Sequence, residues 1–274
     1  MIYLKPTKIN SFGITSKDSD TTAKKVALNI AKTLQKAGFN IKIISPLVSS
    51  AYPIISLTDN NLDIDCIISV GGDGTILKTA RQLKKQIPIL GIHKGGKGIL
   101  TELKHNEIPM LIEQINNNNY VIDKRKRISV SSKSHSPVNA LNEVYIERSE
   151  KLRAITYEIN LPSTVIKDRM DGLIVSTPTG STGHSLSLGS SMLSEDLSAL
   201  LITPIAPISR IPPIAIPISN LSLIAHGQTK VIIDGQIEFI VPALEKIIIN
   251  TKIPDTMFIR FSDSTLRQLT SLGF

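Results

Sequence analysis

The sequence lacks tryptophan, and aromatic residues make up only 4% of its 274 positions. The hydrophobic fraction is nevertheless 41%, so aliphatic side chains must fill the protein's cores. There is a single cysteine, Cys66, which excludes an intramolecular disulfide and is typical of a protein from a reducing compartment. Because Cys66 lies in an apolar run, we expect it to be a small buried hydrophobic residue. We therefore expect a cytoplasmic protein.

Segments that could cross a membrane are also lacking. The first ten residues do not contain the apolar core of a signal peptide. The least charged stretch, residues 199–225, has Arg210 as its only charged residue, but it contains five prolines and cannot form a membrane helix. The sequence predicts no membrane association. Because this stretch is long and apolar for a surface, we expect it to contact a partner.

Acidic residues are in deficit. The 31 Lys and Arg residues outnumber the 23 Asp and Glu residues, and the formal net charge is +8. A positive protein favours anionic ligands such as nucleotides. Basic runs interleaved with aromatic residues, which are typical of proteins that bind nucleic acid, do not occur. We therefore predict no nucleic-acid partner.

The most distinctive segment is residues 69–75, Ser-Val-Gly-Gly-Asp-Gly-Thr. An apolar run precedes it, and apolar residues at helical spacing follow it, which predicts a buried strand, a tight turn and the start of a helix. The glycines let a ligand approach the backbone, and the N–H groups of a helix start favour phosphate. The spacing matches neither a Walker A loop nor the dinucleotide-binding fingerprint.

Asp73 is the unusual member of this segment, because a carboxylate among amides that suit phosphate is repelled by phosphate. Three interpretations are open. Asp73 could hold Mg²⁺, it could accept a proton from an attacking hydroxyl, or it could merely cap the helix that follows.

The first part of the chain alternates strands and helices. This alternation predicts an α/β domain with a mostly parallel sheet and helices on both faces, and ligands bind such sheets beyond the carboxyl ends of the strands. A second glycine-rich segment, residues 93–101, is either another phosphate-binding loop or a solvated loop. The expected strands are 8–14, 41–44, 64–70 and 87–92, and the expected helices are 21–37, the segment from the glycine-rich turn to about residue 85, and 109–115.

From residue 120 the pattern changes to short alternating runs separated by turn residues, which is typical of an antiparallel β domain. The end of the chain, with an expected strand at 256–261 and a helix at 263–272, suits a return to the first domain. We therefore place the α/β domain at residues 1–118, with 251–274 packing back on it, and the β domain at 119–250. The expected β runs are 121–133, 138–147, 153–160, 163–168, 171–177, 229–234, 237–241 and 246–250.

Three further segments carry polar groups. Residues 171–183 end an expected strand in hydroxyls and glycines, which could bind a ribose, an amide or an adenine edge, or could form a Ser/Thr-rich turn. Asn142 and Glu143 place an amide beside a carboxylate, and residues 234–236 read Asp-Gly-Gln between two apolar runs. Each of these two, by itself, is typical of a turn.

Taken in order, six segments resemble the NAD kinase family over residues 70–236: GGDGT, GGKGILTEL, LNEV, DGLIVSTPTGST, TPIAP and DGQ. Lipid kinases of the diacylglycerol and sphingosine type share GGDGT, but STPTGST and the Asn-Glu pair distinguish NAD kinases. The resemblance implies that the β domain is an NAD-binding β-sandwich. It also implies transfer of a phosphoryl group from ATP, or in some members polyphosphate, to the 2′-hydroxyl of the adenosine ribose of NAD, giving NADP.

The resemblance also implies roles for individual residues. Asp73 would be the catalytic carboxylate, and Mg²⁺ would accompany the phosphates of ATP. His184 stands after Gly183 where the family commonly has a tyrosine that packs on a base, so it would stack in its place or be an unrelated surface histidine. A homodimer or homotetramer is implied. The remaining binding residues would be Gly71, Gly72, Gly74 and Thr75 along the phosphates, Asn142 and Glu143 on NAD or the donor, and Asp171, Thr182, Gly183 and Ser187 on the dinucleotide.

Two other functions are alternatives. A lipid kinase would share GGDGT but would not require DGLIVSTPTGST. A non-catalytic nucleotide sensor would keep the glycines but would not need Asp73 or the Asn142-Glu143 pair.

Overall fold

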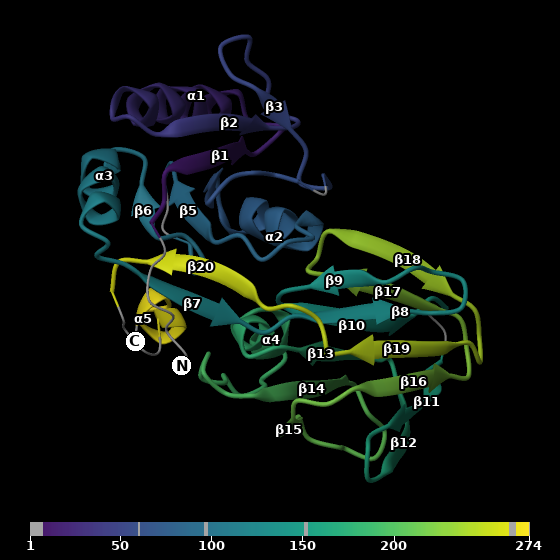
Figure 1. Ribbon diagram of the computed structural model, residues 1–274. Helices are drawn as coiled ribbons and strands as arrows, with labels where there is room; N and C mark the ends of the chain where they lie inside the picture. The colour runs from purple at the N-terminus through teal and green to yellow at the C-terminus, as the bar shows by residue number, and fades with distance from the viewer. Residues whose placement is uncertain (1–7, 60, 96–97, 151–152, 263–266, 274) are drawn as a thin grey trace. The chain divides into compact units, whose positions relative to one another are not determined.

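The structure is a computed structural model and describes residues 8–59, 61–95, 98–150, 153–262 and 267–273 (Figure 1). The chain divides into two compact units. Unit 1 comprises Met1–Arg125 and Asp255–Phe274, and unit 2 comprises Lys126–Pro254. Each unit has a hydrophobic core of its own.

Unit 1 contains a mixed sheet of eight strands. These are β1 (Ser11–Ser16), β2 (Asn40–Ile44), β3 (Ile54–Ile55), β4 (Cys66–Val70), β5 (Ile89–His93), β6 (Leu103–Lys104), β7 (Val121–Arg125) and β20 (Thr256–Arg260). Their order is β3-β2-β1-β4-β5-β20-β7, with β6 paired to β5. All neighbours are parallel except β20 and β7. The predicted α/β fold with a mostly parallel sheet and a returning chain end is confirmed.

Helices cover both faces of this sheet. Successive residues of a strand point to opposite faces, so the contacts of β4 show which helix lies on which face. Cys66, Ile68 and Val70 of β4 share a core with the apolar residues of α1 (Thr21–Lys36) and α3 (Ile108–Asn116). Ser69 points the other way and its hydroxyl lies 3.4 Å from that of Thr79 in α2 (Asp73–Gln82). A short helix, α5 (Arg267–Ser271), follows β20.

Unit 2 consists of two antiparallel sheets of six strands each. The strands are β8 (Ile128–Ser131), β9 (Val138–Ala140), β10 (Glu143–Arg148), β11 (Ile155–Asn160), β12 (Val165–Met170), β13 (Gly172–Ser176), β14 (Ala199–Ile205), β15 (Ile214–Pro217), β16 (Leu221–Ala225), β17 (Thr229–Ile233), β18 (Ile237–Val241) and β19 (Lys246–Asn250). One sheet has the order β15-β14-β13-β10-β17-β18 and the other β12-β11-β16-β19-β8-β9. Inward-facing residues of both sheets form a single core, so the predicted β-sandwich is confirmed.

The β run expected at residues 121–133 divides between the two units. Its first part, β7, pairs antiparallel with β20 in unit 1, and its second part, β8, pairs with β19 in unit 2. The units therefore divide after Arg125 and after Pro254. Alternation of apolar and polar residues identifies a strand but does not say which sheet it joins, and Asp123 and Arg125 are both buried.

The apolar stretch 199–225 forms β14, β15 and β16, to which the sequence had assigned no element. Its prolines hid the strand pattern, because a proline cannot donate to a strand ladder. Pro217 ends the edge strand β15. In the described part of the chain, no helix combines the length and the apolar character that spanning a membrane requires.

Cys66 provides a test of the unit 1 core. It is fully buried, as predicted, and burial, together with the nearby charge of Asp65, raises the pKa of its thiol far above the ordinary value. Since only a thiolate reacts readily, we expect no reaction of the native protein with a water-soluble thiol reagent at mildly alkaline pH. Full reaction is expected in denaturant. Rapid stoichiometric labelling of protein whose circular dichroism remains native would contradict this packing.

Candidate active site

The GGDGT segment lies where β4 ends and α2 begins, as the sequence predicted. The N–H of Gly71 donates to the carbonyl oxygen of Ile92 at 2.9 Å, which fixes the turn at the carboxyl end of the neighbouring strand β5. Gly72 is the N-cap of α2 and Asp73 its first residue, so Gly74 and Thr75 belong to the first helical turn. N–H groups at such a helix start carry partial positive charge and suit phosphate.

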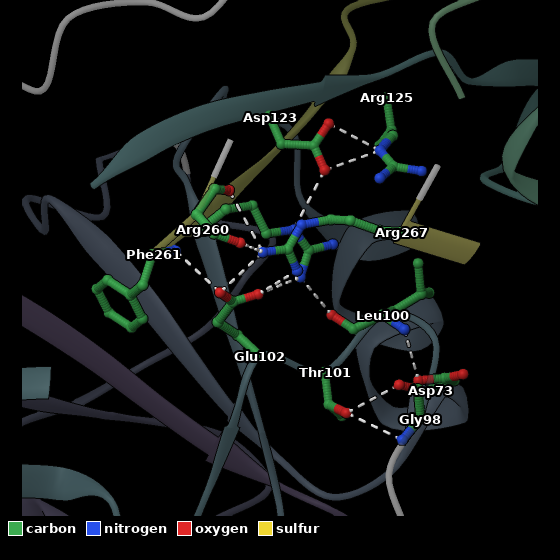
Figure 2. A network of polar contacts seen from close by, with 11 residues as sticks. Asp73, Gly98, Leu100, Thr101, Glu102, Asp123, Arg125, Arg260, Phe261 and Arg267 are labelled. Carbon is green, nitrogen blue, oxygen red and sulfur yellow. Dashed lines mark hydrogen bonds and ion pairs between the residues drawn. The ribbon is translucent and has the colours of Figure 1, made fainter. Parts of the chain in front are cut away.

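The carboxylate of Asp73 is held by the second glycine-rich segment (Figure 2). Its Oδ1 accepts a hydrogen bond from the N–H of Leu100 at 3.0 Å, which Figure 2 shows. Its Oδ2 accepts one from the N–H of Ile99 at 2.9 Å. Both bonds run to this loop and neither to the helix that Asp73 begins. The capping interpretation therefore has no support in the geometry, and the loop fixes where the carboxylate lies.

Gly98 makes this close approach possible. A Cβ atom at residue 98 would overlap the carboxylate of Asp73, so any larger residue there would displace the carboxylate. The N–H of Gly98 donates to the hydroxyl of Thr101 at 3.1 Å, which closes the loop. The ammonium of Lys94 is paired with the carboxylate of Asp20 at 2.5 Å. Residues 96 and 97 lie outside the described part of the chain.

In unit 2, the segments LNEV, STPTGST and DGQ come together around the backbone of residues 141–143. The carboxylate of Asp234 accepts hydrogen bonds from the N–H groups of Leu141, Asn142 and Glu143 at 3.1, 2.8 and 3.2 Å. The hydroxyl of Thr177 donates to the carbonyl oxygen of Leu141 at 2.6 Å. Gly180 packs so closely on Asn142 that a Cβ atom would overlap its carbonyl group.

Asp234 is a structural residue that the sequence analysis did not single out. The segment Asp-Gly-Gln was interpreted only as a hairpin turn, and Asp234 indeed has a positive φ of 49°. The signal that could have identified Asp234 was the position of its segment, DGQ, among the six segments that resemble the family. The structure shows why the carboxylate is needed there: it fixes the backbone that presents Asn142 and Glu143.

Two polar atoms at this point are buried and lack a hydrogen-bond partner among the described residues: Oδ1 of Asn142 and Oε2 of Glu143. Buried polar groups are normally paired, so these atoms fit a ligand that supplies the partners. Burial, and secondarily the negative charge of Asp234, raises the pKa of Glu143 to about 8. At neutral pH the carboxyl is therefore mostly protonated and can donate a hydrogen bond.

His184 lies beside Glu143. Its Nδ1 is 3.9 Å from Oε1 of Glu143, and its ring meets that of Tyr145 edge to face with centroids 6.0 Å apart. A Cβ atom at Gly183 would come within 3.2 Å of Oε2 of Glu143, so Gly183 and His184 both lie next to the Glu143 carboxyl group. The adjoining cavity has a volume of about 250 Å³, and its lining residues are Glu143, Tyr145, Glu147, His184, Ile232 and Gly235.

Asp171 lies in a different cavity of unit 2, which has a volume of about 320 Å³ and shares Tyr145 and Glu147 with the first. The carboxylate of Asp171 is paired with the guanidinium of Arg148 at 2.7 Å. Thr182 donates to the carbonyl oxygen of Thr179 at 3.3 Å, and Ser187 is exposed at the end of α4 (His184–Ser187). No sequence signal marked Tyr145, Glu147 or Arg148 as cavity residues.

Two family models match the chain. The model of the ATP-NAD kinase N-terminal domain matches residues 12–120, and that of the ATP-NAD kinase C-terminal domain matches residues 141–261. The NAD kinase of Thermococcus sibiricus is 30% identical over 262 residues, which cover 92% of this chain and 94% of that protein. The NAD kinase of Methanothermobacter thermautotrophicus is 30% identical over 267 residues, 94% of each chain. This chain belongs to the ATP-NAD kinase family.

Solved structures agree at the level of the fold. The crystal structure of yeast NADH kinase complexed with NADH is similar with a TM-score of 0.84 at 19% identity, over 97% of this chain and 86% of that one. An NAD kinase from Archaeoglobus fulgidus in complex with ATP gives a TM-score of 0.73 at 24% identity, over 96% and 97%. The resemblance inferred from the motifs is confirmed, and the lipid-kinase alternative is excluded by the family match.

The raised pKa of Glu143 makes stability depend on pH. The folded protein binds this proton more tightly than the unfolded chain, in which the pKa is near 4.5. The resulting stabilisation is complete below pH 4.5 and is lost as the pH rises through 8. Glu143→Gln keeps the shape but cannot titrate, so we expect its free energy of unfolding relative to wild type to increase from about pH 5 to about pH 9.

Urea unfolding of both proteins at several pH values measures this difference. Glu147→Gln, the same change at a less buried position of β10, is the control for loss of a carboxyl group from this strand. A difference between wild type and Glu143→Gln that stays constant with pH would contradict the assignment.

Proposed function

We propose that Asp73 is the catalytic carboxylate of this enzyme. As a member of its family, the chain phosphorylates NAD to NADP with ATP. In our proposal, the acceptor is the 2′-hydroxyl of the adenosine ribose of NAD, and the carboxylate of Asp73 accepts the proton of that hydroxyl as the phosphoryl group is transferred. Phosphoryl transfer depends mainly on positioning and charge stabilisation, and a base adds a factor of about 10²–10⁴ in rate.

One observation carries the proposal: a carboxylate is fixed by two backbone N–H groups at a helix start that suits phosphate. Each carboxylate oxygen accepts one of these bonds and retains capacity for another. The carboxylate of Asp73 can therefore accept a hydrogen bond, and then a proton, from a hydroxyl without giving up its place. In this proposal Gly71, Gly72, Gly74 and Thr75 lie along the phosphates.

The groups of unit 2 would recognise NAD. The unpartnered atoms of Asn142 and Glu143 support this, because a ribose or an amide supplies both donors and acceptors. His184 and Gly183 adjoin Glu143 and would complete the same subsite. Asp171, Thr182 and Ser187 would contact other parts of the dinucleotide.

Mg²⁺ would enter with ATP. Among the residues that the structure describes, no group of three or more His, Cys, Asp or Glu side chains could hold a metal ion. Mg²⁺ does not require a ready-made cluster of ligands, because it is commonly bound through substrate phosphates, waters and one or two carboxylates. Asp73 is the carboxylate that would assist, and bound Mg²⁺ would neutralise charge on the phosphates.

The role of Asp73 can be tested by Asp73→Asn. If Asp73 is the base, turnover falls by roughly 10²–10⁴ and NAD affinity changes little, because the amide cannot accept the proton. The amide also gives up one of the two backbone N–H bonds, because only its oxygen can accept. Turnover measured across a Mg²⁺ series, with NAD binding measured separately, distinguishes this from a metal-binding role, in which excess Mg²⁺ would restore part of the rate.

Asp65→Asn is the matched control. Asp65 precedes β4 as Asp73 follows it, and its carboxylate also accepts two backbone N–H groups, those of Asn10 and Ser11. We expect this variant to lose stability and keep its turnover. If Asp73→Asn has wild-type turnover at every Mg²⁺ level, Asp73 has no part in the mechanism.

We also propose that the enzyme is a homodimer or homotetramer that associates through the stretch 199–225. The edge strand β15 and the exposed side chain of Ile208 support this.

A cytoplasmic location remains our proposal and rests on the single, buried cysteine.

Light scattering tests the assembly. We expect a multiple of the monomer mass at micromolar concentration, and we expect Ile208→Glu to lower that mass. Val165→Glu, at a similarly exposed apolar residue of β12, should leave the mass unchanged. A monomeric mass for wild type, or equal effects of both substitutions, would refute this arrangement.

A further inference from the structure

Arg260, the last residue of β20, lies in a buried network of charged groups in unit 1 (Figure 2). Arg260 is only 1% exposed. The guanidinium donates from Nε to Oδ2 of Asp123 at 3.1 Å and from Nη1 to Oε2 of Glu102 at 3.2 Å. Nη1 also donates to the carbonyl oxygen of Leu100 at 2.9 Å, although the two residues are 160 positions apart in the sequence.

Leu100 connects this network to Asp73. Its carbonyl oxygen accepts from Arg260, while its N–H donates to Oδ1 of Asp73. The next N–H back along the chain, that of Ile99, donates to Oδ2 of Asp73. The backbone that holds the carboxylate is therefore anchored on its other side by a buried guanidinium, which reaches it from the far end of the chain.

We propose that Arg260 is a positioning residue: it fixes the backbone of Ile99 and Leu100 and thereby sets the orientation of the Asp73 carboxylate for phosphoryl transfer. This inference rests on the catalytic role proposed above for Asp73. Arg260 itself touches neither the carboxylate nor, in this proposal, any substrate.

The orientation of Arg260 is itself fixed from two sides. Nε of Arg125 donates to both carboxylate oxygens of Asp123 at 2.8 Å, and Oδ2 also accepts the hydrogen bond from Arg260. Glu102 is paired through both oxygens with Arg267, at 2.7 and 3.1 Å. Each carboxylate that orients Arg260 is thus held by a second arginine, so the guanidinium has little freedom to turn away from Leu100.

The charges in the network support one another. Burial by itself raises the pKa of Asp123, but the adjacent guanidinium groups of Arg125 and Arg260 outweigh it and hold the pKa below the ordinary value. Buried ion pairs often stabilise a fold no better than apolar residues of similar volume would. The rigid guanidinium, however, bonds Asp123 through Nε and both Glu102 and a backbone carbonyl through Nη1, whereas a lysine offers one nitrogen and an apolar side chain offers no donor.

Arg260→Lys tests the inference, with Arg267→Lys as the matched control. Both substitutions keep the positive charge and weaken an ion pair with Glu102, but only Arg260 bonds the Leu100 carbonyl. At a temperature where both variants are folded, we expect Arg260→Lys to lower kcat about 10- to 100-fold with little change in KM for NAD or ATP. Arg267→Lys loosens only Glu102 and leaves the bonds of Arg260 to Asp123 and Leu100 in place, so we expect a much smaller loss of kcat, no more than about threefold.

The combination with Asp73→Asn shows whether Arg260 acts through Asp73. If it does, Arg260→Lys has little further effect on kcat once Asp73 is replaced, and the double variant matches Asp73→Asn within about threefold. Independent effects would multiply instead, and this result would overturn the positioning role while leaving that of Asp73 intact. If Asp73→Asn alone has wild-type turnover, the proposed function fails and this inference fails with it.

Hydrogen exchange gives a readout that does not depend on activity. We expect the amide hydrogens of Ile99 and Leu100 to exchange faster in Arg260→Lys than in wild type, and to change much less in Arg267→Lys. If Arg260→Lys does not fold, Asp123→Asn takes its place, because it loosens the hold on Nε and keeps the guanidinium. Unchanged exchange and unchanged kcat in whichever variant folds would overturn the proposal.

Discussion

Two backbone N–H groups, those of Ile99 and Leu100, hold the carboxylate of Asp73, and the proposed role of this carboxylate depends on that contact. Hydrogen bonds to a charged group contribute about 1.5–3 kcal/mol each, so the pair suffices to keep one orientation populated. The contact joins the turn after β4 to the loop after β5, two neighbouring strands of one parallel sheet. Both loops lie at the carboxyl ends of these strands. Arg260 holds the loop after β5 on the side opposite Asp73, through the carbonyl oxygen of Leu100.

Unit 2 uses the same kind of contact for a different purpose. The carboxylate of Asp234 accepts three backbone N–H groups and so fixes residues 141–143. Here the carboxylate is the anchor, and the neighbouring side chains of Asn142 and Glu143 keep unpartnered atoms. In unit 1 the backbone is the anchor, and the carboxylate that it holds is the group that we propose to be catalytic. Both arrangements fix polar groups in advance, which is how a protein lowers the cost of binding and of reaching a transition state.

Much of the fold followed from local patterns in the sequence. The helix expected at residues 21–37 and the buried strand expected before GGDGT are both confirmed by the structure. The strands of residues 199–225 were missed because proline obscures a strand pattern. The hold on Asp73 by Ile99, and the anchoring of Leu100 by Arg260, could not be predicted. These contacts join residues 26 and 160 positions apart, and backbone donors leave no trace in the side-chain pattern.

In our proposal, the fixed carboxylate of Asp73 takes part in the chemical step. The most direct test of this proposal is the single-turnover rate of NADP formation with enzyme in excess over NAD, at saturating ATP and Mg²⁺, because this isolates chemistry from product release. If Asp73 is the base, Asp73→Asn binds NAD normally and forms NADP at least about a hundredfold more slowly than wild type. Equal single-turnover rates for the two proteins would contradict it.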